Sequence, residues 1–184
     1  MPKERSSALS PEYALLGMLR LEPGHGYEVH QRLEQELGAL WTVHQNQAYN
    51  ILNRLEAAGF VRGAPVTGEG THARRRLRLT PAGRRRFDDW LRSPTGLSVR
   101  ALRVGFLTRL YFARRLDPEL ARQVIEGQLA VTREGVARLD QQRSTRRSKG
   151  YLAELSVDLR LRQLALAIEW LEALTERIDG LPAE

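Results

Sequence analysis

Apolar residues recur every three to four positions along most of this 184-residue chain. That spacing places them on one face of an α-helix and predicts a mainly helical protein. Short helices are predicted over residues 13–21, from 26 to about 38, and over 46–58, each followed by a glycine or a Pro-Gly pair that ends it. The N-terminal third of the chain is therefore expected to form three short, packed helices.

The pattern changes from helix to strand near residue 60. A strand-forming segment at 60–62, a glycine-rich loop at 67–71 and a second strand at 74–79 predict a β-hairpin, or wing. The pair Thr80-Pro81 combines a helix cap with a proline suited to the first helical position, and it predicts a fourth helix.

The chain is predicted to divide into two domains at the Ser-Pro-Thr-Gly segment that begins at residue 93. Residues 1–93 have the element order of a winged helix-turn-helix domain. Residues 94–184 are expected to form a helical domain, with helices over 99–115, 118–142 and 151–178. The predicted fold class is thus mainly α with a small β-hairpin.

The last predicted helix carries apolar residues on two faces. One stripe consists of Val157, Leu161, Leu164, Ile168, Leu171 and Ile178, and the other of Leu155, Leu159, Leu166, Trp170 and Leu174. One neighbouring helix cannot cover both faces, so the pattern predicts a partner subunit, and the C-terminal domain is expected to form a homodimer. The residues predicted at this interface are Leu161, Leu164, Ile168, Trp170, Leu171 and Leu174.

The third predicted helix has an outward face rich in amides. Gln45 precedes the helix, and with it the polar residues on this face are Gln45, Gln47, Tyr49, Asn50, Asn53 and Arg54. Gln and Asn can bond adenine bidentately in the major groove, and Arg can pair with guanine or with phosphate. The face predicts binding to double-stranded DNA; the alternative is a polar face that only solvates the helix.

Arginine dominates the charge of the chain, which has 29 Lys and Arg against 22 Asp and Glu and a net charge of +7. Arg74, Arg75 and Arg76 are predicted to lie near the hairpin tip and to contact the DNA backbone. Side chains alternate in direction along a strand, so these three cannot all face one line of phosphates. The arginines at 84–86 are expected to be solvated.

Several other chemistries have no support in the sequence. There is no Cys, and the four His residues include no pair at the spacing of a helical metal site. No nucleophile elbow, phosphate-binding loop or dinucleotide motif is present, so no enzyme, cofactor or metal is expected. No apolar run approaches the roughly 20 residues of a membrane helix, and a cytoplasmic protein is expected.

Two tryptophans, Trp90 and Trp170, are candidates for stacking on a small planar effector. An aromatic residue at helical spacing is more often part of a core or an interface. The identity of an effector is not written in the sequence.

Three motifs resemble one known family. The segments at 15–19 and 25–29, the run from Gln47 to Glu56 with the Gly-Phe-Val that follows, and Leu-Thr-Pro-Ala-Gly at 79–83 resemble the PadR family of transcriptional regulators. The second half is similar to the longer subgroup with extended C-terminal helices. The resemblance implies a homodimer that binds an inverted-repeat operator and represses a neighbouring gene, with Tyr49, its polar neighbours and basic wing residues facing DNA.

The chain departs from the family pattern at two places. Asn46 stands where the family often has Gly, and the wing has Ala73 and three arginines in place of an aromatic-containing segment. A different class of function also remains open, a winged-helix adaptor that binds a partner protein and no specific DNA. Such an adaptor would more often expose Leu, Phe or Tyr on its third helix.

Overall fold

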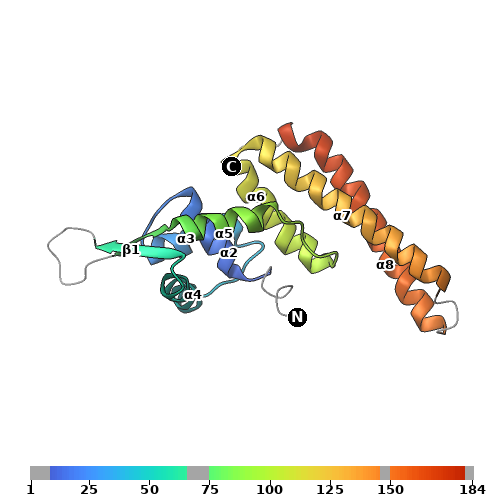
Figure 1. The fold of residues 1–184 in the computed structure, drawn as a ribbon, viewed down its shortest axis with the longest axis horizontal. Helices are drawn as coiled ribbons and strands as arrows, with labels where there is room; N and C mark the ends of the chain where they lie inside the picture. The colour runs from blue at the N-terminus through green and yellow to red at the C-terminus, as the bar shows by residue number, and fades with distance from the viewer. Residues whose placement is uncertain (1–8, 66–74, 146–149, 181–184) are drawn as a thin grey trace.

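The computed structural model describes residues 9–65, 75–145 and 150–180, and these form a mainly helical fold with one β-hairpin (Figure 1). In chain order the elements are α2 (Pro11–Leu21), α3 (Gly26–Leu37), α4 (Gln45–Ala57), β1 (Val61–Pro65), β2 (Arg75–Leu79), α5 (Pro81–Arg92), the π-helix η1 (Ala101–Phe106), α6 (Leu107–Leu116), α7 (Pro118–Thr145), α8 (Tyr151–Arg177) and the 3₁₀ turn η2 (Ile178–Gly180). The predicted fold class, a winged helix-turn-helix domain followed by long helices, is confirmed.

Helices α2, α3 and α4 form the helix-turn-helix part of the N-terminal domain. The start of α2 follows the sequence signal, because Ser10 Oγ accepts a hydrogen bond from the Glu12 amide at 3.3 Å and Pro11 occupies the first turn. The spacing of Tyr27, Val29, Leu33 and Leu37 predicts that they share the inner face of α3, but Tyr27 is 53% exposed. The buried stripe begins at Val29, and two residues along a helix turn a side chain to nearly the opposite face.

The hairpin pairs β1 with β2 in an antiparallel register in which Val61 lies opposite Leu79 and Arg62 opposite Arg78. Val61 and Leu77 are buried, so one face of the hairpin belongs to the core. Gly24 forms an isolated antiparallel β-bridge with Leu77 of β2. Its N–H donates to the Leu77 carbonyl, and its carbonyl accepts from the Leu77 N–H. The turn before α3 is thereby fixed to the wing.

Helix α6 joins the C-terminal helices to the N-terminal core. The Phe112 ring is fully buried and lies directly over Gly17 of α2, where a Cβ atom would overlap the ring. Phe112 also meets the edge of Phe87 on α5, with ring centroids 5.4 Å apart. The apolar core is continuous across residue 93, so α6 packs as part of the N-terminal core; the division into 1–93 and 94–184 stays a prediction.

The segment before α6 differs from the sequence expectation of one regular helix over 99–115. Residues Ala101–Phe106 form a π-helix, and the α-helix begins at Leu107. A π-helical turn changes the rotation of the following residues about the axis, so apolar periodicity alone does not reveal it.

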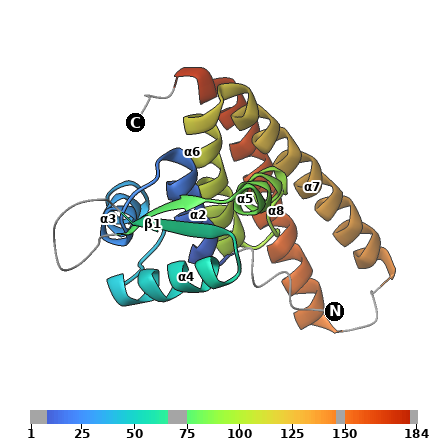
Figure 2. The ribbon, with the colours of Figure 1, turned by 60° about the vertical axis from the view of Figure 1, so that its left-hand side comes forward.

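Helices α7 and α8 lie side by side and project away from the N-terminal core (Figure 2). Two of the residues predicted for the dimer interface are placed differently from the prediction: Leu164 is 1% exposed and Leu171 fully buried within the single chain. Both side chains are covered by other residues of the same chain, which leaves little of their surface for a partner. The other stripe of α8 is the exposed one.

The contact between Phe112 and Gly17 generates a stability prediction. Gly17→Ala should lower the free energy of unfolding by about 1–3 kcal/mol or more, because the new methyl group overlaps a ring that has no room to move. Urea unfolding followed by circular dichroism measures the change.

The matched control is Gly127→Ala on α7, where a Cβ would meet only Pro94 Cγ at 3.7 Å. That variant should be as stable as the parent or gain up to about 1 kcal/mol, as expected for Gly to Ala in a helix. Equal effects of the two substitutions would contradict the packing described for α6.

Candidate nucleic-acid interface

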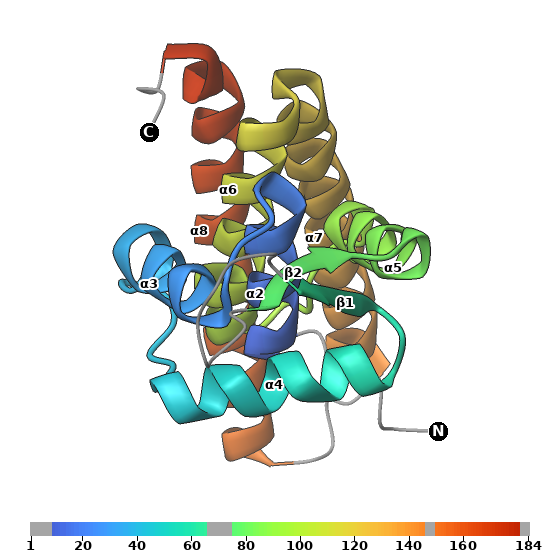
Figure 3. The same ribbon diagram turned by 90° about the vertical axis from the view of Figure 1, so that its left-hand side faces the viewer.

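Helix α4 runs along one edge of the N-terminal domain, with one face in the core and the other in solvent (Figure 3). Its buried residues are Ala48, Ile51, Leu52 and Leu55, which follow the helical period. His44 precedes the first turn and Gly59, with φ of 76°, follows the last. Gly suits that positive φ because it has no Cβ.

The outward face of α4 presents every polar residue named for it. Gln45, Gln47, Tyr49, Asn50, Asn53 and Arg54 are all exposed. Across the described part of the chain, no protein group forms a hydrogen bond or ion pair with the side chains of Gln47, Asn50, Asn53 or Arg54. Their donors and acceptors are available to a partner.

Tyr49 has a partly structural position. Its ring lies against Gly26 at the start of α3, where a Cβ would come within 2.7 Å of Cε1. Together with Tyr27 of α3, it lines a cleft of about 560 Å³ between α3, α4 and β2. Exposure of Tyr27 could have been found from its offset relative to Val29 on the helix.

Two of the three predicted wing arginines lie within the described residues, and their environments differ. Arg74 lies outside the described residues. Arg76 is exposed, and its Nη2 donates to the Pro23 carbonyl at 3.2 Å. Arg75 Nη2 donates to Glu56 Oε1 of α4 at 2.5 Å, so this guanidinium already has a carboxylate partner within the protein.

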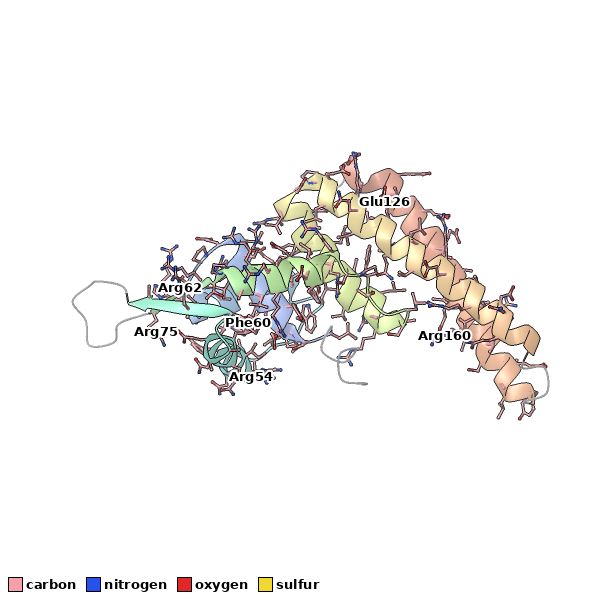
Figure 4. All side chains as sticks on the ribbon, in the orientation of Figure 1. Arg54, Phe60, Arg62, Arg75, Glu126 and Arg160 are labelled. Atoms are coloured by element: carbon pink, nitrogen blue, oxygen red, sulfur yellow. The ribbon has the colours of Figure 1, made fainter. Side chains whose placement is uncertain are left out.

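Sequence reasoning missed two further arginines of the hairpin. Arg62 and Arg78 are cross-strand partners, both exposed on the face that carries Arg76. Figure 4 shows Arg62 on the opposite side of the hairpin from Arg75 and Arg54. Directly opposed residues of a hairpin share a face, so this pair could be recognised only once the register of the hairpin was known.

Side chains at the junction between the N-terminal domain and α6 form three buried hydrogen bonds. Trp41 Nε1 donates to Thr108 Oγ1 at 2.8 Å. Arg109 donates to the Trp90 carbonyl from Nε and to the Gly105 carbonyl from Nη1, each at 3.0 Å. Burial lowers the pKa of the Arg109 guanidinium to about 10, so this cation remains charged at neutral pH.

The two tryptophans that are candidates for an effector site, Trp90 and Trp170, differ in exposure. Trp90 is buried, its ring stacks on Tyr13 with centroids 4.8 Å apart, and the Arg109 guanidinium lies 4.1 Å from its centroid. Trp170 is 46% exposed and lines a groove of about 440 Å³ with Leu102, Leu107 and other residues of η1, α6 and α8. Only Trp170 is open to a ligand in this conformation.

Two of the histidines, His25 and His30, have hydrogen-bond partners within the fold. His30 Nε2 is 2.7 Å from the Val43 carbonyl, and His25 Nδ1 is 3.2 Å from the Arg75 carbonyl. In the described residues, no group of three His, Asp or Glu side chains is arranged to hold a metal ion. Within the same ranges, none of the helices is both long and apolar enough to cross a membrane.

The arrangement of a helix-turn-helix, a hairpin and a following helix defines the winged helix-turn-helix class. Residues 15–89 match the model of the transcriptional regulator PadR-like family. The chain is 30% identical over 121 residues to the negative transcriptional regulator PadR of Bacillus subtilis, and this alignment covers 64% of each protein. These two matches confirm the resemblance to the PadR-like family that the motifs predicted.

Two solved structures are similar across nearly the whole chain. One is Bacillus subtilis PadR in complex with operator DNA, at 23% identity and a TM-score of 0.43, with 91% of this chain and 98% of that chain covered. The other is the PadR-like regulator from Bacillus cereus, at 21% identity and a TM-score of 0.43, with 97% of this chain and 99% of that chain covered. The aligned part spans just under two thirds of the length of the regulator matched by sequence.

The Trp41–Thr108 hydrogen bond generates a second prediction. Thr108→Val keeps the shape of the side chain but leaves the buried indole N–H without an acceptor, which should cost about 1–3 kcal/mol of unfolding free energy. Thermal unfolding monitored by tryptophan fluorescence measures the loss.

Thr175→Val is the control, since the Thr175 hydroxyl donates only to the Leu171 carbonyl of its own helix. It should change the stability by less than about 0.5 kcal/mol. A Thr108→Val variant as stable as this control would show that the junction does not depend on the bond.

Proposed function

We propose that this protein is a transcriptional repressor that binds an inverted-repeat operator as a homodimer and reads base edges with α4. The observation that carries the proposal is the unpaired polar face of α4, with Gln47, Asn50 and Asn53 exposed and free of protein partners in the described residues. Its match to the PadR-like family model and the printed role of the Bacillus subtilis relative, a negative regulator, support repression.

The chemistry of the α4 face suits the major groove. Each of the three amides offers a donor and an acceptor, the pair that adenine complements at N7 and N6. An α-helix fits the width of the major groove, and the residues lie on one exposed side of α4. A protein-docking face would be expected to expose more apolar surface than Tyr49 provides.

Phosphate contacts position such a helix without reading sequence. Arg54, on the same exposed side of α4, and Arg76, on the wing, are the arginines we assign to this role among those placed by the structure. Neither has a carboxylate partner in the described ranges. The net charge of +7 adds a general attraction to DNA.

Dimerisation would use the exposed stripe of α8. Leu155, Leu159, Leu166 and Trp170 lie at spacings of four and seven residues on one side of the helix, and each is about half exposed or more. An apolar stripe of this length is rarely left in water. We expect a second copy that covers this stripe to hold the two α4 helices roughly 34 Å apart, which is the distance between successive major grooves.

An effector, if this regulator has one, would bind at the groove beside Trp170. The groove is largely apolar and shares Leu166 and Trp170 with the proposed dimer stripe, so a planar ligand there would change how the two subunits meet. Trp90 is not proposed for this role, because its ring is stacked on Tyr13 inside the protein.

The DNA-binding proposal is tested by a gel shift on the DNA upstream of the protein's own gene, with excess unrelated duplex as competitor. The parent protein should retain the upstream fragment in the presence of competitor. Asn53→Ala should weaken specific binding by about tenfold to a hundredfold, because a bidentate contact is worth about 1–3 kcal/mol.

Gln123→Ala removes an exposed amide from α7, far along the chain from α4, and should leave the affinity unchanged. The adaptor alternative predicts no retention of any duplex at low salt by parent or variants. Loss of affinity in both variants alike would also count against base reading by α4.

The dimer proposal is tested by sedimentation. The double substitution Leu159→Gln and Leu166→Gln should convert a dimer to a monomer, since it places two amides in the apolar stripe. The control is Tyr27→Ser, which removes a large side chain of the N-terminal domain that is also more than half exposed. It should leave the dimer intact. A parent protein that sediments as a monomer at micromolar concentration contradicts the proposal.

A further inference from the structure

One carboxylate oxygen links α4 to both strands of the wing. Glu56, in the last turn of α4, accepts a hydrogen bond at Oε1 from the Gly63 amide at 2.9 Å and another from Arg75 Nη2 at 2.5 Å. The Glu56 side chain is 24% exposed and the Arg75 side chain 56% exposed, so the carboxylate end of this ion pair is partly shielded from solvent. Glu56, Gly63 and Arg75 are called the wing clamp below.

Gly63 provides the space that the clamp needs. A Cβ on Gly63 would lie 2.8 Å from Arg75 Nε and 2.9 Å from Nη2, so the guanidinium lies across the Gly63 backbone on its way to Glu56. Among the described glycines only Gly59 and Gly150 have positive φ. Glycine at position 63 is therefore explained by the passing arginine and not by the backbone conformation.

The backbone of Arg75 is also held. Its carbonyl lies 3.2 Å from His25 Nδ1, and the neighbouring Leu77 is bonded to Gly24 through both its N–H and its carbonyl. Arg75 is thus fixed to the turn before α3 at its main chain and to α4 at its side chain. The arginines on the other hairpin face, Arg62 and Arg78, have no such partner among the described residues.

We infer that the wing clamp sets the angle between the recognition helix α4 and the wing, and that Arg75 is a positioning residue and not a phosphate contact. This inference rests on the proposed function for its role in DNA binding. It changes the sequence expectation for Arg75, which was grouped with Arg74 and Arg76 as a backbone contact. The reason is that its guanidinium is engaged by Glu56 and directed toward α4.

The effect expected for Glu56 is opposite to the effect that net charge alone predicts. Removing a negative charge from a DNA-binding domain ordinarily strengthens binding, because one source of repulsion with phosphate is lost. If Glu56 holds the wing in place, its removal instead weakens binding. The sign of the effect of Glu56→Gln therefore separates the two accounts.

The experiment measures the affinity of the full chain for the upstream fragment by fluorescence anisotropy at several salt concentrations. The variants are Glu56→Gln, Arg75→Gln and Gly63→Ala, the last of which keeps both charges but displaces the guanidinium. Glu22→Gln is the control: Glu22 pairs with Arg32 on the same domain at 3.2 Å, and neither residue belongs to the wing clamp. Circular dichroism checks that every variant is folded.

The inference predicts that all three clamp variants bind about tenfold more weakly, with the slope of log affinity against log salt unchanged, while Glu22→Gln binds at least as well as the parent. Two results overturn it. One is unchanged or tighter binding by Glu56→Gln. The other is a slope that falls by about one unit in Arg75→Gln alone, which identifies Arg75 as a phosphate contact.

A readout without DNA keeps this test separate from that of the proposed function. Amide hydrogen exchange at residue 63 should be slow in the parent and at least about tenfold faster in Glu56→Gln, because the Gly63 N–H donates to that carboxylate. If the parent binds no DNA, the proposed function fails, and the exchange rates still decide whether the clamp holds the wing. Equal rates in parent and variant overturn the clamp.

Discussion

The packing of α6 against α2 is the constraint on which the rest of the structure depends. Phe112 occupies the space over Gly17, and its ring continues into the aromatic cluster of Phe87 and Trp90. Burial of this large apolar side chain gives much of the driving force that joins the long helices to the N-terminal domain. The polar contacts beside it, Trp41 with Thr108 and Arg109 with the Trp90 carbonyl, then fix the angle of the junction.

This junction explains how α4 can be both exposed and rigid. Ala48, Ile51 and Leu55 seat the helix on the same continuous core that receives α6. The stability of α4 comes from that buried face, so its polar face is not needed for the fold and is left to a partner. Under the proposed function, a change in the contact of α7 and α8 with a second copy would reach α4 through α6 and alter DNA binding.

Most of the elements could be predicted from the sequence, because their signals are local. The cap at Ser10, the proline after Thr80 and the period of the apolar residues identify the helices, and the positions of the α4 amides follow from that period. The motifs also carried the family resemblance. Even the two apolar faces of α8 were visible, although the sequence did not show which of them its own chain covers.

The remaining features depend on tertiary contacts between distant residues. Burial of Leu164 and Leu171 requires α7 as a neighbour, and the pairing of Arg75 with Glu56 requires the hairpin register and the space at Gly63. The π-helix before α6 and the burial of Arg109 have no local signature, since arginine is ordinarily exposed.

The central claim is that two α4 helices enter successive major grooves of one operator. Dimethyl sulfate protection of the upstream duplex tests it directly, because the reagent methylates guanine N7 in the major groove. The account predicts two protected segments whose centres are about 10 base pairs apart, related by the symmetry of the repeat. Retention of the duplex while guanines within both segments stay reactive, or with protection confined to a single site, would contradict it.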